Sequence, residues 1–231
     1  MKPHQPVLFW STLVVIVMAL VTGVLEPKRI DYIPHCFKSP TLAMELPRSG
    51  RDLQILLDGP ASSTRGAFRR QTLADFLFIL CYVFLWFRLT RKISWVLASV
   101  VILAGIADCF ENLGILRAVA SVAPSQAIAD ATRYPALIKW TLLGVAFSSL
   151  LYLFWPRDPA RDGWQILELV VGLSYAWGGI LCLAGALFQN LWIEQSMLPL
   201  SAALVLQLSV FAFAPVREPV SGAPVATDPP R

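Results

Sequence analysis

Charged residues are scarce in this sequence. Only 15% of the 231 residues are Asp, Glu, Lys or Arg, whereas 56% are hydrophobic. An average soluble domain has roughly a quarter of its residues charged. The composition therefore excludes an ordinary soluble domain and indicates a membrane protein.

Histidine and cysteine are too few, or too isolated, for several familiar chemistries. The two histidines, His4 and His35, lie in the N-terminal segment and in the first long loop, which excludes a His-rich hydrolase site inside the membrane. The four cysteines show no CxxC or Cys/His spacing typical of zinc or redox sites. GxSxG, HExxH, P-loop and GxGxxG motifs are also missing. No catalytic machinery of the soluble type is indicated.

The net charge of +4 does not indicate nucleic-acid binding. The basic residues gather beside hydrophobic segments, as in RGAFRR (65–70) and RLTRK (88–92). Helix flanks at a membrane surface explain this pattern better than a nucleic-acid interface does. We expect these side chains to anchor helices at the interface, with binding of anionic lipid headgroups as the alternative.

Long apolar runs are what the sequence has in abundance. A helix needs about 20 apolar residues to cross a bilayer, and the runs are continuous rather than alternating, which disfavours a β-barrel. The sequence predicts an all-α, polytopic transmembrane helical bundle with six spans. The spans are Val7–Leu25, Leu73–Leu89, Ile93–Asn112, Ala136–Trp155, Ile166–Phe188 and Trp192–Ala214.

The first run could instead be the apolar region of a signal peptide, but its uninterrupted length favours a retained helix. The loop 26–70 is expected to be extramembrane and to pack over one end of the six-helix domain (1–214). Within it, Ser49 and the apolar Leu53, Leu56 and Leu57 predict a short interfacial helix. The Pro-rich tail 215–231 is expected to be disordered.

The distribution of basic residues favours a cell-membrane topology with both termini in the cytoplasm. Five Lys/Arg lie in the RLTRK and PRDPARDGW (156–164) connections, whereas Arg133 is alone between residues 118 and 135. These short connections place the loop 26–70 outside. Counting the many charges of that loop itself would reverse the assignment.

Polar residues collect at one end of the predicted bundle. Asp108, Glu111 and Asn112 share one helix face, on which Gly105 and Ala104 also lie, so this face should meet another helix. Alternation of six spans brings further polar side chains to the same leaflet. The candidate ligand-binding or polar-network residues are Asp75, Tyr82, Asp108, Glu111, Asn112, Lys139 and Asn190.

Two interpretations of this polar cluster stay open. It is either a site that binds or relays an ion or small polar ligand, or an interhelical network in which Lys139 neutralises an acid. Its oxygen ligands would suit Mg²⁺, Ca²⁺ or Mn²⁺ rather than zinc, but no metal site is predicted and no cofactor is indicated. Thr72 and Asp75 also fit a helix-capping pattern, which would explain Asp75 without a site.

Small residues repeat along the fifth predicted span. Ser174, Gly178, Cys182 and Ala186 recur every four positions, a spacing that permits close helix packing. We expect this face to contact other helices of the bundle, a second copy of the chain or another membrane protein.

The sequence resembles a set of uncharacterised bacterial multi-pass membrane proteins in three features: DFLF (75–78) in one span, DCFEN (108–112) in the next span, and Lys139 in the span after that. The resemblance covers about half of the chain and implies no particular substrate or reaction. From the residues themselves, we expect an integral membrane protein that binds or translocates a small polar or ionic ligand at an acidic pocket in one leaflet. A structural or assembly protein and a lipid-modifying membrane enzyme are the alternatives.

Overall fold

The computed structural model describes residues 5–28, 30, 33–34, 37–58, 64–156 and 163–214. Over these residues the chain forms helices and no strands, which confirms the all-α prediction. The tail 215–231 and both histidines lie outside the described residues. The helices are α1 (Pro6–Leu25), α2 (Pro40–Glu45), α3 (Gly50–Leu57), α4 (Thr64–Thr90), α5 (Trp95–Ala120), α6 (Gln126–Phe154), α7 (Gly163–Phe188) and α8 (Trp192–Phe213).

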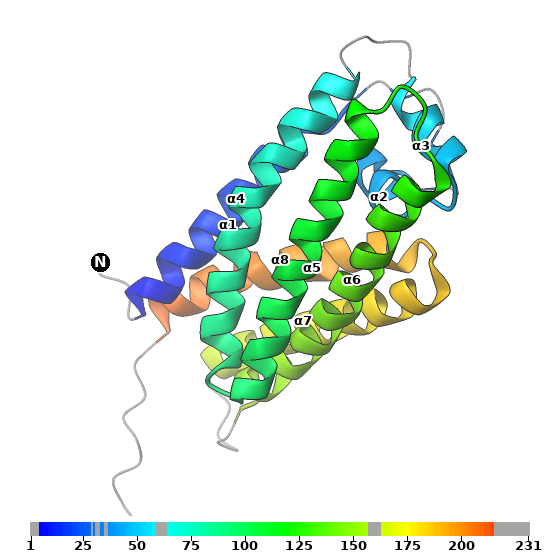
Figure 1. The fold of residues 1–231 in the computed structure, drawn as a ribbon. Helices are drawn as coiled ribbons and strands as arrows, with labels where there is room; N and C mark the ends of the chain where they lie inside the picture. The colour runs from blue at the N-terminus through cyan, green and yellow to red at the C-terminus, as the bar shows by residue number, and fades with distance from the viewer. Residues whose placement is uncertain are drawn as a thin grey trace, which may run out of the picture.

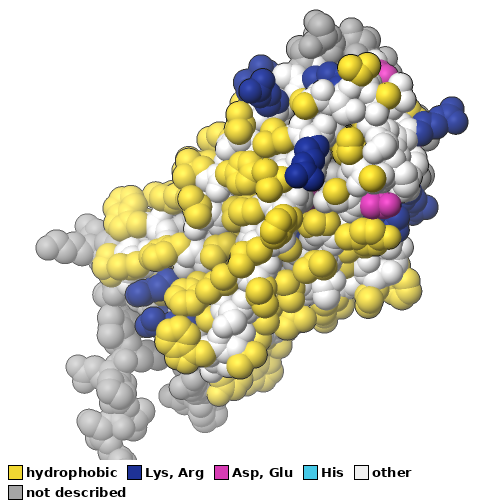
Figure 2. All heavy atoms as spheres, viewed as in Figure 1, with side chains coloured by type: hydrophobic (Ala, Val, Ile, Leu, Met, Phe, Trp, Pro, Cys, Tyr) yellow, Lys and Arg dark blue, Asp and Glu magenta, His cyan; other side chains and the backbone are white. Residues whose placement is uncertain are grey.

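Within the described part of the chain, six helices are long and apolar enough to cross a membrane: α1 and α4 to α8. Their outer surface is broadly hydrophobic, and several Lys and Arg side chains lie toward the two ends of the face in Figure 2. This pattern suits helices whose flanks sit at the two membrane surfaces. The chain is therefore a multi-pass membrane protein.

The six long helices form a ring. Each helix from α4 to α8 packs against the next in the sequence, and α1 closes the ring by contacting both α4 and α8. Figure 1 shows that α1 begins and α8 ends at the same end of the bundle, and that α7 and α8 run obliquely across α4 to α6. Near this end, Gln207 Nε2 of α8 donates a hydrogen bond to Thr12 Oγ1 of α1 at 2.8 Å.

Three helices extend well beyond the predicted spans. Helix α4 begins at Thr64 rather than Leu73, α5 ends at Ala120 rather than Asn112, and α6 begins at Gln126 rather than Ala136. Hydropathy marks only the part of a helix that lies in lipid, whereas these added turns bury one face against α2 and α3 or against each other. The ends are therefore set by packing outside the apolar run.

Two local sequence predictions are wrong for the same reason. Pro135 directly precedes the fourth predicted span, and because proline suits a first helical position the sequence predicts that it opens the helix. Helix α6 instead starts nine residues earlier and has Ser125 as its N-cap. Thr72 does not cap α4, since its hydroxyl donates to Phe68 O one turn back at 2.8 Å. Asp75 consequently lies inside a helix, and helix capping does not account for it.

The segment 37–58 forms a structured cap over one end of the ring. The predicted short helix is confirmed as α3: Ser49 accepts from the Asp52 N–H and Asp52 accepts from the Ser49 N–H, a reciprocal capping box. The apolar Leu53, Leu56 and Leu57 are buried, so α3 packs with its apolar face against the protein. Helix α2, capped by Ser39, was not predicted.

The cap is held to the ring by contact with the α5–α6 connection. A Cβ added to Gly50 would lie 2.4 Å from Pro124 O and 2.8 Å from Ser125 C, both backbone atoms that cannot rotate away. Gly50→Ala should therefore lower the free energy of unfolding by about 1–3 kcal/mol. Thermal unfolding in detergent measures this change.

Gly66→Ala is the matched control for Gly50→Ala. At Gly66 the nearest atom to an added Cβ is the flexible Arg70 Nη1 at 3.5 Å, so replacing glycine in this helix should be neutral or stabilising. Equal unfolding midpoints of the two variants would show that the cap does not pack against the ring through Gly50.

The small residues of α7 serve contacts within the chain. A Cβ at Gly178 would lie 2.6 Å from the Leu200 side chain of α8, and one at Gly179 would lie 2.7 Å from Gly144 O of α6. The outward side of α7 carries large exposed side chains such as Trp177. A partner or second copy at this span stays a prediction, and it would meet these large side chains rather than the glycines.

Candidate functional site: an acidic cavity with one buried lysine

Lys139 of α6 is the centre of a buried ionic cluster. Its Nζ lies 2.8 Å from Glu111 Oε2 and 3.3 Å from Asp108 Oδ1, both on α5, and 3.0 Å from Glu45 Oε2 on α2. All four residues are at least nine-tenths buried. Buried charges persist only when they are paired in this manner.

Two further side chains orient the acids. Tyr82 OH of α4 donates to Asp108 Oδ2 at 2.7 Å, so both oxygens of Asp108 are engaged. Asn112 Nδ2 of α5 donates to Asp75 Oδ2 of α4 at 2.8 Å. The cluster thus joins α4, α5 and α6, with α2 from the cap.

Glu45 is a site residue that the sequence analysis missed. Its Oε2 accepts from Lys139 and from the Trp140 indole N–H at 3.1 Å. The other oxygen, Oε1, accepts no hydrogen bond from the part of the chain that the structure describes. Burial raises the pKa of Glu45 above its ordinary value, and Lys139 opposes this effect.

A signal for Glu45 was present in the sequence. It stands between Met44 and Leu46 in a mainly apolar segment bounded by Pro40 and Pro47. An acid in such a short apolar segment of a loop indicates packing against the protein, although no local pattern names its partner.

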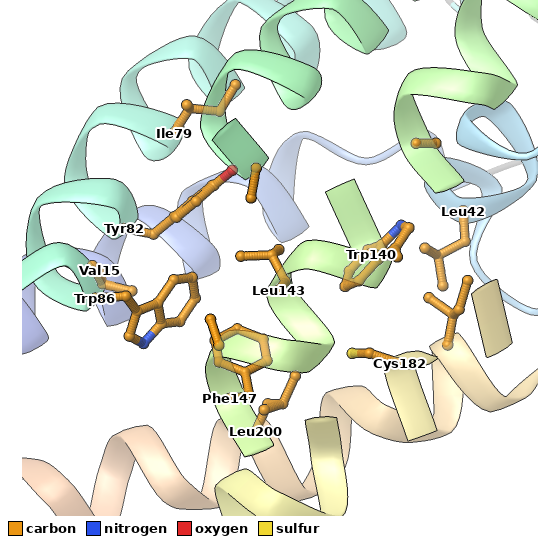
Figure 3. Packing of buried hydrophobic residues seen from close by; sticks show 14 of the residues in the cluster. Val15, Leu42, Ile79, Tyr82, Trp86, Trp140, Leu143, Phe147, Cys182 and Leu200 are labelled. Carbon is orange, nitrogen blue, oxygen red and sulfur yellow. The ribbon is translucent and has the colours of Figure 1, made fainter. Parts of the chain in front are cut away.

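A cavity of about 490 Å³ lies inside the ring beside this cluster. Its polar end contains Glu45, Asp75, Asp108 and Lys139, and its remaining walls are largely apolar. Figure 3 shows several of these walls: Tyr82, Trp86, Leu143, Phe147 and Leu200 surround the same space. Trp86 lies against both Tyr82 and Phe147, with ring centroids 5.0 Å and 4.5 Å apart.

The cap and the end of α1 complete the polar end. Glu26, which follows α1, accepts from Ser39 Oγ at 2.7 Å and from Thr41 Oγ1 at 2.8 Å. Gln71 of α4 donates to Thr41 Oγ1 at 2.7 Å. Glu194 of α8 accepts from the Lys38 N–H at 3.0 Å. Glu26 and Glu194 line the cavity as well, so acids enter it from several elements.

The structure brings together six of the seven residues proposed from the sequence. Asp75, Tyr82, Asp108 and Lys139 line the cavity, whereas Glu111 and Asn112 contact these residues from behind. Asn190 is not part of the cluster. It lies in the α7–α8 turn, where its side chain accepts from the Trp192 N–H at 3.0 Å.

The two sides of the cluster differ in what they can do chemically. Glu111 contacts Lys139 through both oxygens, at 2.8 and 2.9 Å, and does not reach the cavity. Asp108 and Glu45 contact the same lysine and do reach the cavity. The Lys139–Glu111 pair therefore ties α5 to α6, whereas Glu45 and Asp108 present negative charge to any occupant.

Negative charge exceeds positive charge in the cluster. The carboxylates of Glu45, Asp75, Asp108 and Glu111 face the single ammonium group of Lys139, and three negative charges are unbalanced when all are ionised. In a medium of low dielectric constant these charges require bound protons or a bound cation. Within the described residues, no three His, Cys, Asp or Glu side chains are arranged to hold a metal ion.

Comparison with known proteins finds no matching protein family, no similar curated protein and no similar solved structure, so the function has to be inferred from the cavity itself.

Proposed function

We propose that this protein binds a small ligand with a positively charged polar group in the acidic cavity. The observation that carries the proposal is the excess of carboxylates at the polar end of a cavity of about 490 Å³. This volume lies within the range of small-molecule sites, which are usually largely apolar with a few placed polar groups. The aromatic walls add favourable cation–π contacts.

Lys139 does not cancel the preference of the cavity for a positively charged ligand, because its ammonium group is already paired with carboxylates. It donates to three carboxylates and lies 4.8 Å from the centre of the Trp140 ring. The open Oε1 of Glu45 and the carboxylate of Asp75 are the groups that can accept from a ligand. An organic ammonium ion satisfies both the charge and these acceptors.

A purely structural network is the second candidate, and the position of Glu111 favours it for part of the cluster. Glu111 is 1% exposed and contacts Lys139 away from the cavity. A network alone would not need an adjoining cavity that is lined by the three other acids of the cluster. We assign the structural role to Glu111 and the binding role to Glu45, Asp75 and Asp108.

The binding role can be tested with n-butylammonium and n-butyrate as probes of opposite charge. In detergent, n-butylammonium should raise the thermal unfolding midpoint of the protein and n-butyrate should not. Asp108→Asn and Glu45→Gln should each weaken n-butylammonium binding by about 10-fold or more, because each removes one negative charge from the polar end of the cavity.

Asp130→Asn is the matched control, since Asp130 contacts Gln126 and lies outside the cavity. Its affinity for n-butylammonium should equal that of the unmodified protein. Equal stabilisation by both probes, or n-butylammonium binding that survives both acid substitutions, would refute the proposal.

We also infer that the cap faces the outside of the cell and both termini face the cytoplasm. The end of the bundle opposite the cap carries Arg88 in the last turn of α4 and Arg91 and Lys92 in the α4–α5 connection, and short connections flanked by Lys and Arg favour the cytoplasm. A cysteine introduced at exposed Arg51 should react with a membrane-impermeant maleimide in intact cells, and one at Arg91 should not.

A further inference from the structure

The cavity reaches the outer surface of the ring between α1 and α8. Ala19 and Gly23 of α1 and Ser201 of α8 line the cavity and are also exposed. A Cβ added at Gly23 would meet no atom within 4 Å. These three small residues therefore mark an opening, here called the portal, in a surface that faces lipid.

The portal arises from the way α1 and α8 pack. The buried residues of α1 are Leu8, Thr12 and Val15, all in its first half. Thr12 is also the residue that bonds Gln207, near the C-terminal end of α8. Beyond Val15 the C-terminal half of α1 has no buried residue, and the cavity lies there instead, between α1 and the first half of α8.

The cap covers the polar end of the cavity on its other side. Glu26, Ser39 and Thr41 connect the end of α1 to α2, and Gln71 connects α2 to α4. Glu45 of α2 reaches into the ionic cluster from the same side. A ligand coming from water would have to displace these contacts, whereas one coming from lipid would not.

The lining changes in polarity along the cavity. Acids gather beneath the cap, whereas Phe147, Leu200 and Leu204 line the part farther from it. A ligand that matches this gradient has a charged head and an apolar chain. The exposed portal residues give that chain a route into the bilayer.

Resting on the proposed function, we propose that the ligand is an amphiphile with an amine headgroup, which enters from the membrane through the portal. The headgroup lies among Glu45, Asp75 and Asp108, and the chain extends past Ser201 and Gly23. A fatty acid with a chain as long as that of the amine should not bind in the cavity, because its carboxylate would meet an excess of negative charge.

Photolabelling tests the portal. The probes are dodecylamine and dodecanoic acid, each with a diazirine at the middle of the chain, added to the protein in phosphatidylcholine nanodiscs. The amine should label peptides from residues 19–23 and 197–204 about 10-fold more than the acid does, given the strength of charge-assisted contacts. Asp108→Asn should reduce this difference.

Two bulky substitutions test the route of entry. Gly23→Trp and Ser201→Trp place an indole in the portal from opposite sides, and both positions are exposed. Each should lower amine labelling about 10-fold, and neither should change the unfolding midpoint of the ligand-free protein, because substitutions at exposed positions have little effect on stability. Ala202→Trp is the matched control, because Ala202 is exposed beside Ser201 but does not line the cavity.

The outcomes separate this inference from the proposed function. If n-butylammonium binds but the long-chain amine does not label the portal peptides, or labels them in both portal variants as strongly as in the unmodified protein, the amphiphile and its route are wrong. If the fatty acid labels as strongly as the amine and n-butylammonium does not bind, the acidic cavity is not a cation site and both proposals fail.

Discussion

Lys139→Met is expected to lower the free energy of unfolding by about 3–5 kcal/mol, which is the usual cost of removing one partner from a buried ion pair. The substitution keeps a long apolar side chain but removes the one cation that, among the described residues, contacts Glu45, Asp108 and Glu111. Three buried carboxylates then face one another without compensation. Thermal or denaturant unfolding of the purified protein in detergent measures the loss.

Lys92→Met controls for the loss of a lysine as such. Lys92 is exposed in the α4–α5 connection, and its Nζ donates to Gln5 Oε1 at 3.3 Å. Its substitution should leave stability nearly unchanged, as is usual at surface positions. If the two variants unfold alike, Lys139 does not hold the cluster together.

Adding Glu111→Gln to Lys139→Met should restore part of the stability. The double variant has the same net charge as the unmodified cluster, and the amide removes the carboxylate closest to the missing lysine. A double-mutant cycle should therefore show a favourable interaction of at least about 1 kcal/mol between the two positions. Additive losses would instead mean that the Lys139–Glu111 pair contributes no coupling.

Gly179→Ala is expected to be nearly as damaging, at about 3 kcal/mol. The new methyl group would lie 2.6 Å from Ser148 N and 2.7 Å from Gly144 O, both in the backbone of α6. Rotamer changes cannot relieve a contact with backbone, so α6 and α7 must move apart and lose packing along their length. Because α6 also carries Lys139, the shift should disturb the ionic cluster.

Gly163→Ala controls for the effect of the methyl group on helix α7. Gly163 is exposed at the start of the same helix, where an added Cβ meets nothing within 4 Å. The expected change in unfolding free energy is small. An unfolding midpoint for Gly179→Ala within error of Gly163→Ala would contradict the close α6–α7 packing.

The number and type of the long helices could be predicted because hydropathy reports directly which residues can lie in lipid. The grouping of Asp75, Asp108, Glu111 and Lys139 at one end also followed, since the alternating direction of successive spans fixes which helix ends share a leaflet. Both predictions depend on local patterns read along one helix at a time. Asn190 was placed in the same leaflet by this argument, but sharing a leaflet does not decide which side chains touch.

The starts of α4 and α6, and the place of Glu45 in the cluster, depend on contacts that no local pattern carries. The added turns of α4 and α6 lie outside the apolar runs, so hydropathy did not reveal them. The sequence predicts that the helix of the third span continues past Leu116 until SVAPSQ (121–126), and α5 does end at Ala120. Glu45 joins the cluster across 94 residues of chain from Lys139. Its partner depends on how the cap folds back over the ring.

The sequence by itself determined that the chain is a multi-pass membrane protein, that six helices of its described part are long and apolar enough to span a membrane, and that its acids collect at one end. Only the tertiary structure decided that these acids border a cavity, that Glu45 completes the cluster and that α1 and α8 leave a portal between them. The physical reason is that partition into lipid is a property of each segment, whereas a cavity is the space left where helices distant in the sequence fail to meet.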